Sequence, residues 1–476
     1  MNNMSDSKNP LVCETRYDRA SCQIGIVHLG FGAFHRAHQA VYIDDYMEQS
    51  GDYRWGIAAV NLRGSESESF ASVAAETAEN DGYFLKAISA DGAANLQKIR
   101  AHVGFFDWAV MKDETEALLS SPDVHLVTIT VTESGYYIDP NGALDTAHPL
   151  IQEEIAGSAA QSCYAYLRVA LHLRMTTIGQ PLTIACCDNI RKNGKMLHRN
   201  LLAYLAACGD DALHAWVVEN VAFPCSMVDR ITPRSPASLS DELTKQFGKT
   251  IASPVMSEDF IQWVLSDEAK GPMPDLAQVG VTLTDNVDPY EETKIRVLNG
   301  GHTATAYFAA LEGVLTFDEC MRHPELRAHF DGFETDEVLT GLTLDLPFSK
   351  TEYLAMTASR FGNQAIGDTV ARICADGMAK FPIFIRPTLE SCFKQGVTPA
   401  HAIRAIASWY VFARHVQAGK ISFDYVEPSW QSLVDMLADG SFFNSRQLWG
   451  DVPEAYPEFG TLLQQEILQL EAKWPI

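Results

Sequence analysis

The chain lacks a long apolar run. No hydrophobic stretch in its 476 residues approaches the roughly 20 residues that a membrane-spanning helix needs. The opening residues, Met-Asn-Asn-Met-Ser-Asp-Ser-Lys, are polar and have no apolar core of the kind that a signal peptide requires. We therefore expect no membrane partner and a cytoplasmic location.

Positive charge is also scarce. The sequence holds 36 lysines and arginines against 61 aspartates and glutamates, which gives a net charge of −25 and a pI near 4.9. A polyanion such as DNA, RNA or an acidic membrane surface would be repelled by this charge. This excess of negative charge argues against nucleic acid as a partner and favours a small-molecule ligand.

The ten cysteines are scattered, and none is part of a C-x-x-C pair. This spacing argues against a disulfide framework and a structural zinc site, and it favours reduced thiols. The remaining composition, 47% hydrophobic and 20% charged, is typical of a globular protein. Since 476 residues exceed what one hydrophobic core usually serves, two or more domains are expected.

A glycine-rich turn follows the first apolar run. Ile24–Leu29 leads into Gly30-Phe-Gly32, and helical spacing follows. A strand, a glycine turn and a helix can cradle a pyrophosphate, because glycines allow close backbone approach and the helix start supplies N–H donors. The third glycine of the dinucleotide fingerprint is absent and His35 stands in its place, so a plain tight turn is the alternative. Arg36 either adds a charge at the phosphate or is a surface cation.

The second predicted strand, Arg54–Asn61, ends where such a fold reads the adenosine ribose. An acid there favours NAD, whereas an arginine accommodates the 2′-phosphate of NADP. The sequence offers Asn61, Arg63 and Glu66. NAD and NADP therefore both stay open at this point.

Two later predicted strands end in polar residues. Val124–Val131 runs into Glu133, and Pro181–Cys187 runs into Asn189. In open α/β sheets ligands bind beyond the carboxyl ends of the strands, which is where both side chains are expected. The alternative is that they are ordinary turn residues, and we prefer that interpretation for Asn193-Gly194.

The spacing of hydrophobic residues along the sequence divides the chain into three parts. Residues 1–22 are interpreted as an N-terminal tail. Residues 23–287 alternate strands and helices, with a crossover helix near 155–175, which predicts an α/β dinucleotide-binding, Rossmann-like domain with a parallel sheet. Residues 288–476 show helical spacing without strand-like alternation, which predicts a mainly α-helical C-terminal domain for substrate and catalysis.

A lysine, an asparagine and a histidine are spaced as K-x4-N-x2-H where the helical part begins. Asp288 suits a helix N-cap. At about 100° per residue, Glu291, Lys294, His302 and Asn299 lie at roughly 60°, 0°, 80° and 140° around one helix. An amine, an amide and an imidazole on one side, next to an acid, suit the binding and deprotonation of a hydroxyl group, because buried polar groups need partners.

The ordinary alternative is that Lys294 reaches water, Asn299 and His302 bond to backbone, and Glu291 is only a cap. The glycine pair Gly300-Gly301 argues against it. Each glycine inside a helix costs about 1 kcal/mol relative to alanine, which indicates that something approaches this backbone closely.

Two cations occur farther along the helical part. Arg372 and Lys380 flank Ala-Asp-Gly-Met in a helix that is expected to end at Phe381-Pro382. They are candidates to donate hydrogen bonds to substrate oxygens. The alternative is that both are ordinary cations on the solvated surface.

Five motifs occur in order along the chain. They are Gly30-Phe31-Gly32-Ala-Phe34-His35-Arg36-Ala-His38-Gln39, Thr130-Val-Thr132-Glu133-Ser-Gly135-Tyr136, Cys187-Asp188-Asn189-Ile190, Met227-Val-Asp229-Arg230-Ile231 and the run from Lys294 to His302. Together they resemble the motifs of the mannitol dehydrogenase family, the polyol-specific long-chain dehydrogenases and reductases. The combination is specific although each piece is not.

This resemblance implies roles for the site residues. Lys294 would be the general base, since burial lowers the pKa of an ammonium from about 10.4 towards the working range. Asn189 and Asn299 would donate to the developing alkoxide, His302 would orient the substrate, and Glu291 would relay the proton. The matching substrate-binding positions are Asp229, Arg372 and Lys380. The cofactor-binding positions are Gly30, Phe31, Gly32, Phe34, Arg36, Asn61, Arg63 and Glu133, and no metal is implied.

The leading hypothesis is an NAD-dependent oxidoreductase that interconverts a sugar alcohol such as mannitol or arabinitol with its ketose, with NADP not excluded. We expect a monomer or a small homo-oligomer. A hexuronate (fructuronate or tagaturonate) reductase of the same family is the first alternative, although a uronate carboxylate needs an extra cation. Less favoured are a non-catalytic nucleotide-binding protein and a zinc alcohol dehydrogenase, for which His35-x-x-His38 is the only hint.

Overall fold

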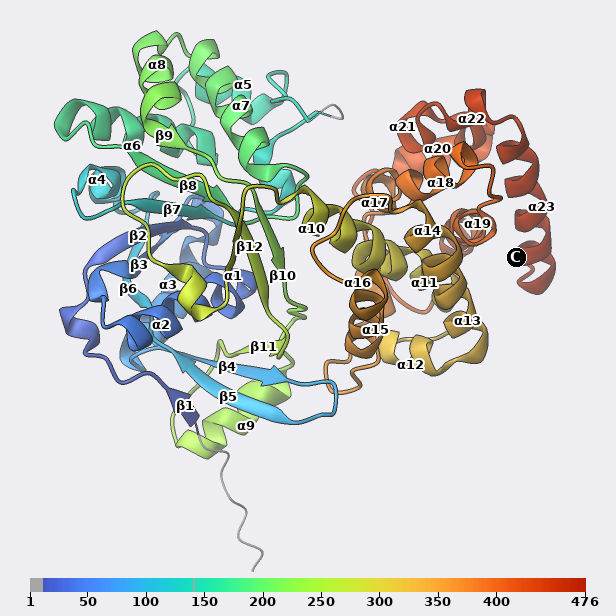
Figure 1. Cartoon of the computed structure of the whole chain (residues 1–476), viewed down its shortest axis with the longest axis horizontal. Coiled ribbons are helices and arrows are strands. Elements are labelled where there is room, and N and C mark those ends of the chain that lie inside the picture. Colours follow the sequence, from blue (N-terminus) through green and yellow to red (C-terminus); the bar gives the residue numbers. More distant parts are fainter. Residues whose placement is uncertain (1–11, 140–141) are drawn as a thin grey trace, which may run out of the picture. The chain divides into compact units, whose positions relative to one another are not determined.

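The computed structural model describes residues 12–139 and 142–476 (Figure 1). The chain divides into two compact units, of which the first ends at Val287 and the second comprises Asp288–Ile476 together with the short segment Ala90–Gly92. In the described ranges, no helix combines the length and the apolar character that crossing a membrane requires.

A parallel sheet forms the centre of the first unit. Within the described residues it has six strands in the order β6-β3-β2-β7-β8-β9. Ile26 of β2 pairs with Ile57 of β3 on one side and with Leu126 of β7 on the other. The strand bounds are β2 Ile24–Leu29, β3 Gly56–Asn61, β6 His102–Asp107, β7 Leu126–Ile129, β8 Leu182–Cys186 and β9 Val221–Ala222. The predicted α/β, Rossmann-like fold of this part is confirmed.

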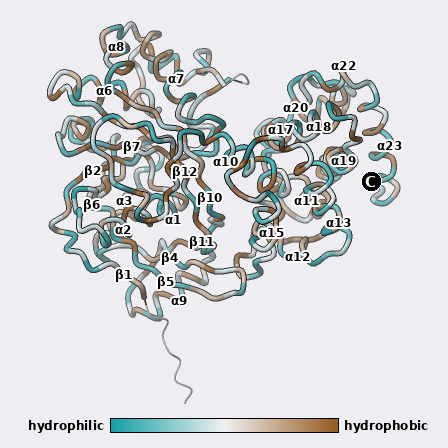
Figure 2. The backbone as a smooth tube through the Cα atoms, viewed as in Figure 1, coloured by the Kyte–Doolittle hydropathy of each residue, from teal (hydrophilic) through white to brown (hydrophobic). Residues whose placement is uncertain are grey.

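Each face of this sheet carries its own hydrophobic core, because successive side chains along a strand point to opposite faces. Val27 and Val127 pack with helices α6 and α7, whereas Ile26 and Leu126 pack with α2. Both α6 and α7 mix hydrophobic and hydrophilic stretches (Figure 2), as expected of helices that cover a sheet and face water on their outer side. The helices of this unit are α1 Ala33–Ala37, α2 Gln39–Ser50, α3 Ser67–Glu79, α4 Lys112–Ala117, α5 Pro149–Ile155, α6 Cys163–Thr177, α7 Asn193–Ala207, α8 Asp211–Asn220 and α9 Ala237–Phe247.

Two smaller sheets complete the described part of the first unit. One has the order β1-β5-β4-β11 and the other the order β10-β12-β13. Their strands are β1 Val12–Glu14, β4 Tyr83–Ile88, β5 Ala94–Ile99, β10 Ser226–Asp229, β11 Val255–Glu258, β12 Gln262–Ser266 and β13 Thr282–Thr284.

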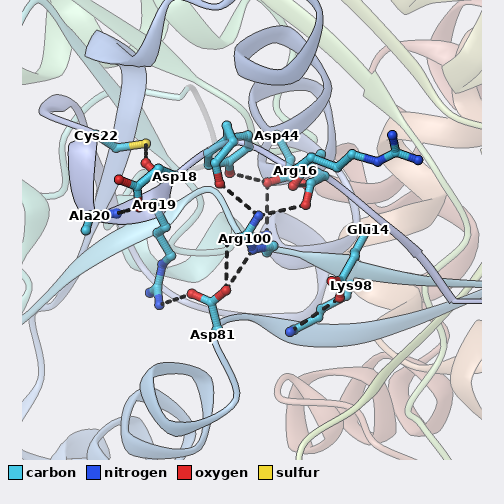
Figure 3. Close-up of polar contacts among 12 residues, drawn as sticks. Glu14, Arg16, Asp18, Arg19, Ala20, Cys22, Asp44, Asp81, Lys98 and Arg100 are labelled. Atoms are coloured by element: carbon cyan, nitrogen blue, oxygen red, sulfur yellow. Dashed lines mark hydrogen bonds and ion pairs between the residues drawn. The ribbon is translucent and has the colours of Figure 1, made fainter.

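The segment 12–22 is part of the fold, so its interpretation as a tail is wrong for the residues described; residues 1–11 lie outside them. Val12–Glu14 pairs in parallel with β5. Tyr17 is buried and donates a hydrogen bond to Asp44 over 2.5 Å, and Arg100 donates to the carbonyl oxygens of this segment (Figure 3). Backbone pairing and single polar contacts leave no periodic pattern in the sequence, which is why the segment resembled a tail.

The second unit is helical, as predicted. Its centre is α11, in which every residue from Gly300 to Ala310 is buried, and α11 packs against α13, α16 and α19. The helices are α10 Asp288–Thr293, α11 Gly300–Leu311, α12 Phe317–Arg322, α13 Pro324–Gly332, α14 Leu339–Gly341, α15 Lys350–Phe361, α16 Val370–Cys374, α17 Gly377–Phe384, α18 Arg386–Lys394, α19 Ala400–Gln417, α20 Trp430–Asp439, α21 Arg446–Trp449, α22 Val452–Ala455 and α23 Glu458–Lys473. Two segments are π-helical, η7 Lys294–Asn299 and η8 Phe333–Val338.

Candidate active site

The two glycines of the turn after β2 have different surroundings. Gly30 has a φ of +114°, and a Cβ there would lie 2.6 Å from the carbonyl oxygen of Thr130, so the turn runs against the end of β7. Gly32 is the N-cap of α1, and a Cβ on it would meet no atom within 4 Å. The first glycine is therefore required by the packing of the protein, and the second faces open space.

That open space belongs to a cavity of about 340 Å³ above β2, β3 and β7. Its volume is within the about 300–1,000 Å³ that small-molecule sites usually have. Five of the predicted cofactor residues line it, namely Gly30, Phe31, Gly32, Asn61 and Arg63. Glu133 lines a second cavity of about 550 Å³, which shares Arg63 and Gln161 with the first.

Arg36 and Phe34 were predicted to bind the cofactor, but neither residue lines either cavity. Arg36 is buried, donates from Nη1 to the carbonyl oxygen of Ser253 over 2.8 Å, and places its guanidinium 5.4 Å from the ring centres of Phe31 and Tyr83. Phe34 stacks on His38, with ring centres 5.0 Å apart. Both side chains point into the protein from α1, so the phosphate role predicted for Arg36 is not supported by its position.

The end of β3 presents one cation and one acid. The Asn61 amide donates to the carbonyl oxygen of Arg63 over 2.9 Å and to Asp107 over 3.1 Å, which fixes the turn. Arg63 Nη1 lies 3.7 Å from Glu66 Oε1, and the two side chains are 37% and 58% exposed. The end of the cavity next to β3 therefore carries a loosely paired cation and acid.

Sequence reasoning missed a buried histidine cluster below the glycine turn. His28 hydrogen-bonds to the hydroxyls of Thr128 and Thr130, over 2.8 and 2.9 Å, and stacks on His35. His35 Nε2 lies 2.9 Å from His102 Nε2. Burial lowers the pKa of all three imidazoles. The one signal was a histidine inside the apolar run Ile24–Leu29, and the contacts of His35 show that it is a core residue and not part of the phosphate turn.

The ends of β7 and β8 are joined by the carboxylate of Asp188. Its Oδ2 accepts from the Tyr136 hydroxyl over 2.7 Å and from the backbone N–H of Val131 over 2.9 Å. Asn189, the next residue, is exposed, as is Glu133. Burial raises the pKa of Asp188 to about 6.

Asn193 is not a turn residue, which corrects the interpretation that we preferred for it. It is the first residue of α7, is 1% exposed, and donates to the carbonyl oxygens of Asp188 and Ser226 over 3.0 and 2.9 Å. It therefore connects the end of β8 to β10, the strand that ends at Asp229. The Asp229 side chain is buried as well, at 3% exposure.

In the second unit, Lys294 and Asn299 begin and end the π-helical segment η7. Lys294, Glu291 and His302 are buried, at 7%, 8% and 8% exposure. The prediction of one regular helix is wrong here, because a π-helix closes i→i+5 bonds in a wider turn and the positions calculated at 100° per residue do not apply. Such segments inside α-helices occur frequently at functional sites.

Asn299 Oδ1 and His302 Nε2, both in this stretch, are buried and have no hydrogen-bond partner among the described residues. The His302 ring is held by aromatic contacts, stacked on Phe361 at 3.8 Å and edge-on to Phe317 at 4.5 Å between ring centres. Since buried polar atoms are nearly always satisfied, these two are suited to a ligand that brings hydroxyl groups.

The glycine pair at the start of α11 makes room for the protein itself. A Cβ on Gly301 would lie 2.5 Å from Glu334 Oε1 and 2.8 Å from the Phe330 ring, and one on Gly300 would lie 3.2 Å from the carbonyl oxygen of Phe384. The close approach inferred from these glycines is therefore made by α13, η8 and α17. Glu334 is fully buried, and burial raises its pKa well above the usual range.

His302 lies in a cationic neighbourhood. Burial, followed by the charges of Arg372, Arg360 and Lys380, holds its pKa well below the usual value, so the imidazole is neutral at pH 7. The structure thus brings the predicted Arg372 and Lys380 close to His302 and adds Arg360, which the sequence analysis missed because α15 has an ordinary amphipathic pattern.

Both predicted cations also bond within the protein. Arg372 donates to both carboxylate oxygens of Asp368, over 2.6 and 2.5 Å, and Lys380 donates to the carbonyl oxygen of Ile373 over 2.9 Å. They lie on two helices, α16 and α17, and not on one as predicted. The chain breaks at Asp376, which has a φ of +60°, and Pro382 lies inside α17.

The histidine pair that hinted at zinc is used for packing. His35 contacts His102, as described, and His38 Nε2 lies 2.8 Å from the carbonyl oxygen of Gln262. Among residues 12–139 and 142–476, no group of three or more His, Cys, Asp or Glu side chains is arranged to hold a metal ion.

Two family models match the chain. One, described as the mannitol dehydrogenase Rossmann domain, matches residues 24–278, and the other, described as the mannitol dehydrogenase C-terminal domain, matches residues 286–450.

Relatives of known function match over nearly the whole length. The mannitol 2-dehydrogenase of Cereibacter sphaeroides is 34% identical over 471 residues, which cover 97% of this chain and 96% of the relative. The D-arabinitol 4-dehydrogenase of Klebsiella pneumoniae is 35% identical over 402 residues, which cover 84% of this chain and 86% of the relative.

A solved structure of Pseudomonas fluorescens mannitol 2-dehydrogenase, a ternary complex with NAD and D-mannitol, has a TM-score of 0.87 and 31% identity, covering 97% of this chain and 94% of the other.

Proposed function

Because the chain belongs to the mannitol dehydrogenase family, we propose that it is a polyol dehydrogenase. It oxidises a secondary alcohol of a sugar alcohol of the mannitol or arabinitol type to the ketose, and catalyses the reverse reduction, with NAD as cofactor. The observation that carries this proposal is the pair of unpartnered buried atoms, Asn299 Oδ1 and His302 Nε2, in the same helical stretch as the buried Lys294.

The residues around the glycine turn fit a dinucleotide. Gly32 faces open space, Asn61 and Arg63 stand at the end of β3, and the cavity joins them. These residues would hold NAD, which supplies the hydride acceptor when bound. The exposed pair of Arg63 and Glu66 gives the chain the means to use NADP as well.

In the proposed reaction Lys294 is the general base. Its buried amine takes the proton from the substrate hydroxyl, and a positioned base of this kind contributes about 10²- to 10⁴-fold. The amide of Asn299 donates to the developing alkoxide, a contact worth roughly 3 kcal/mol in the transition state. We propose the same donor role for Asn189. Glu291, three residues before Lys294, relays the proton onwards.

The remaining polar groups bind the substrate chain. His302 is neutral, so one ring nitrogen can accept and the other can donate to a hydroxyl next to the reacting carbon. Arg372 and Lys380 supply donors to more distant hydroxyls, and the resemblance assigns Asp229 a similar contact as an acceptor. A polyol, which carries a hydroxyl on every carbon, matches this mixture of donors and acceptors.

A hexuronate reductase is the second candidate, and Arg360 favours it. A uronate carboxylate needs an additional cation, and Arg360 is a third cation close to His302. Two arginines and a lysine near one imidazole could hold a carboxylate.

A substrate panel distinguishes these candidates. NADH formation is followed with pentitols, hexitols and aldonates, and NADH consumption with ketoses and keto-uronates, each with and without a chelator. Turnover of a neutral polyol that survives the chelator supports the proposal. Preference for the acids selects the second candidate, activity destroyed by the chelator rejects the lysine mechanism, and NADH binding without any turnover indicates a nucleotide-binding protein.

A further inference from the structure

The carboxylate of Asp188 holds together two turns that carry different parts of the proposed site. Strands β7 and β8 are parallel neighbours, and Ile129 pairs with Cys186 near their carboxyl ends. Beyond these ends, Asp188 Oδ2 accepts from the Tyr136 hydroxyl over 2.7 Å and from the Val131 N–H over 2.9 Å. One side chain after β8 thus bonds to two groups of the segment after β7.

The segment after β7 has a backbone that needs such support. Thr132 has a φ of +65° and Tyr137 a φ of +47°. A β-branched residue at positive φ is a strained outlier, and such strain persists only where the surrounding structure fixes it. Asp188 bonds to Val131, the residue directly before Thr132. Both Val131 and Thr132 line the cavity that we assign to the dinucleotide.

The backbone of Asp188 is held in place as well. Its own carbonyl oxygen accepts from the buried amide of Asn193 over 3.0 Å. Asn189 follows directly in the chain, so the place of its amide depends on how the Asp188 backbone is held. The Tyr136 ring is fully buried, and its hydroxyl, which donates to Asp188, also lies 3.0 Å from Cys186 Sγ at the end of β8.

We propose that Asp188 is a positioning residue whose carboxylate sets both the Val131–Thr132 wall of the dinucleotide cavity and the turn that carries Asn189. This inference rests on the proposed function. It predicts that one hydrogen bond, between two side chains to which we assign no contact with the substrate, controls cofactor affinity and turnover together.

Tyr136→Phe tests the role with the smallest change. It removes the donor to Asp188 and leaves the buried ring. NADH affinity is measured by fluorescence titration, kcat and KM by steady-state kinetics, and folding by thermal melting. We expect NADH binding and kcat each to fall on the order of 10-fold, the size of one lost hydrogen bond to a charged group. Asp188→Asn, which also disturbs the bond to Val131, should show a larger loss of both.

Tyr17→Phe is the matched control. Tyr17 is also buried in the first unit and donates to a buried aspartate, Asp44, over 2.5 Å. Neither residue lines a described cavity. This variant should lose thermal stability while NADH affinity and kcat stay within two-fold of wild type.

A rescue variant separates positioning from simple stability. Glycine adopts positive φ without strain, so Thr132→Gly in the Tyr136→Phe background should recover NADH affinity. A double variant that binds NADH no better than Tyr136→Phe overturns the proposal. So does a Tyr136→Phe protein that behaves like Tyr17→Phe. Wild-type protein that turns over no polyol sinks the proposed function instead, and this measurement is made first.

Discussion

Gly301 gives a quantitative test of how helix α11, which carries His302, is packed. Alanine is preferred over glycine inside a helix by about 1 kcal/mol, so Gly301→Ala would ordinarily stabilise the protein. Here the new Cβ would stand 2.5 Å from Glu334 Oε1 and 2.8 Å from the Phe330 ring. Both neighbours are fully buried and cannot swing into solvent. Overpacking of this kind costs about 1–3 kcal/mol.

The net expectation for Gly301→Ala is a loss of up to about 2 kcal/mol in the free energy of unfolding, after the helix preference is subtracted. Gly460→Ala in α23 is the matched control, because a Cβ there meets no atom within 4 Å. It should be neutral or stabilise the protein by up to about 1 kcal/mol. Because His302 follows Gly301 directly, kcat should fall in the first variant only.

Urea unfolding followed by far-UV circular dichroism measures both variants, and steady-state kinetics measures kcat. The expected order of stability is Gly460→Ala at or above wild type, and Gly301→Ala below it. Equal stability and equal turnover of the two variants would refute the close packing of η8 against α11.

Three further predictions concern the two units separately. Asn299→Ala should lower kcat by about 100-fold, as expected for a lost transition-state donor, with an unchanged dissociation constant for NADH; weaker NADH binding would argue against the role. Arg63→Ala should lower kcat/KM for NADP about tenfold more than for NAD, the size of one lost hydrogen bond to a charged group, and equal losses would remove Arg63 from the 2′ site. Burial lowers the pKa of His35 to about 3, below its unfolded value of about 6.5. The neutral His35 imidazole therefore stabilises the folded protein above a pH of about 6.5, and this contribution is lost as the pH falls towards 3. The urea midpoint should fall as the pH falls from 7 to 4, less so in His35→Asn, and an equal fall in both proteins would contradict the assignment.

Much of the first unit could be predicted from the sequence, because its central strands are short apolar runs that end in glycine or polar residues. Ile24–Leu29 and the strand ends before Glu133 and Asn189 follow this rule, and the α/β fold is confirmed. The carboxyl ends of parallel strands lie at one edge, so ligand residues near them can be found from strand order alone.

Other features had no sequence signal of the kind that periodicity detects. The π-helical segment η7 breaks the 3.6-residue repeat on which the angles of Lys294 and Asn299 were calculated. Arg36 of α1 faces the protein and bonds to Ser253, and only the fold determines that direction. The contacts of His28 and Asp188 join strands that are far apart in sequence. The roles of the site residues stay predictions.

The central claim is that Lys294 accepts the proton from the substrate hydroxyl. Lys294→Ala, assayed at saturating polyol and NAD, tests it most directly when NADH binding is titrated on the same sample. We expect kcat to fall by about 10²- to 10⁴-fold while the dissociation constant for NADH stays within two-fold of wild type. A variant that turns over at a near-normal rate would show that another group takes the proton.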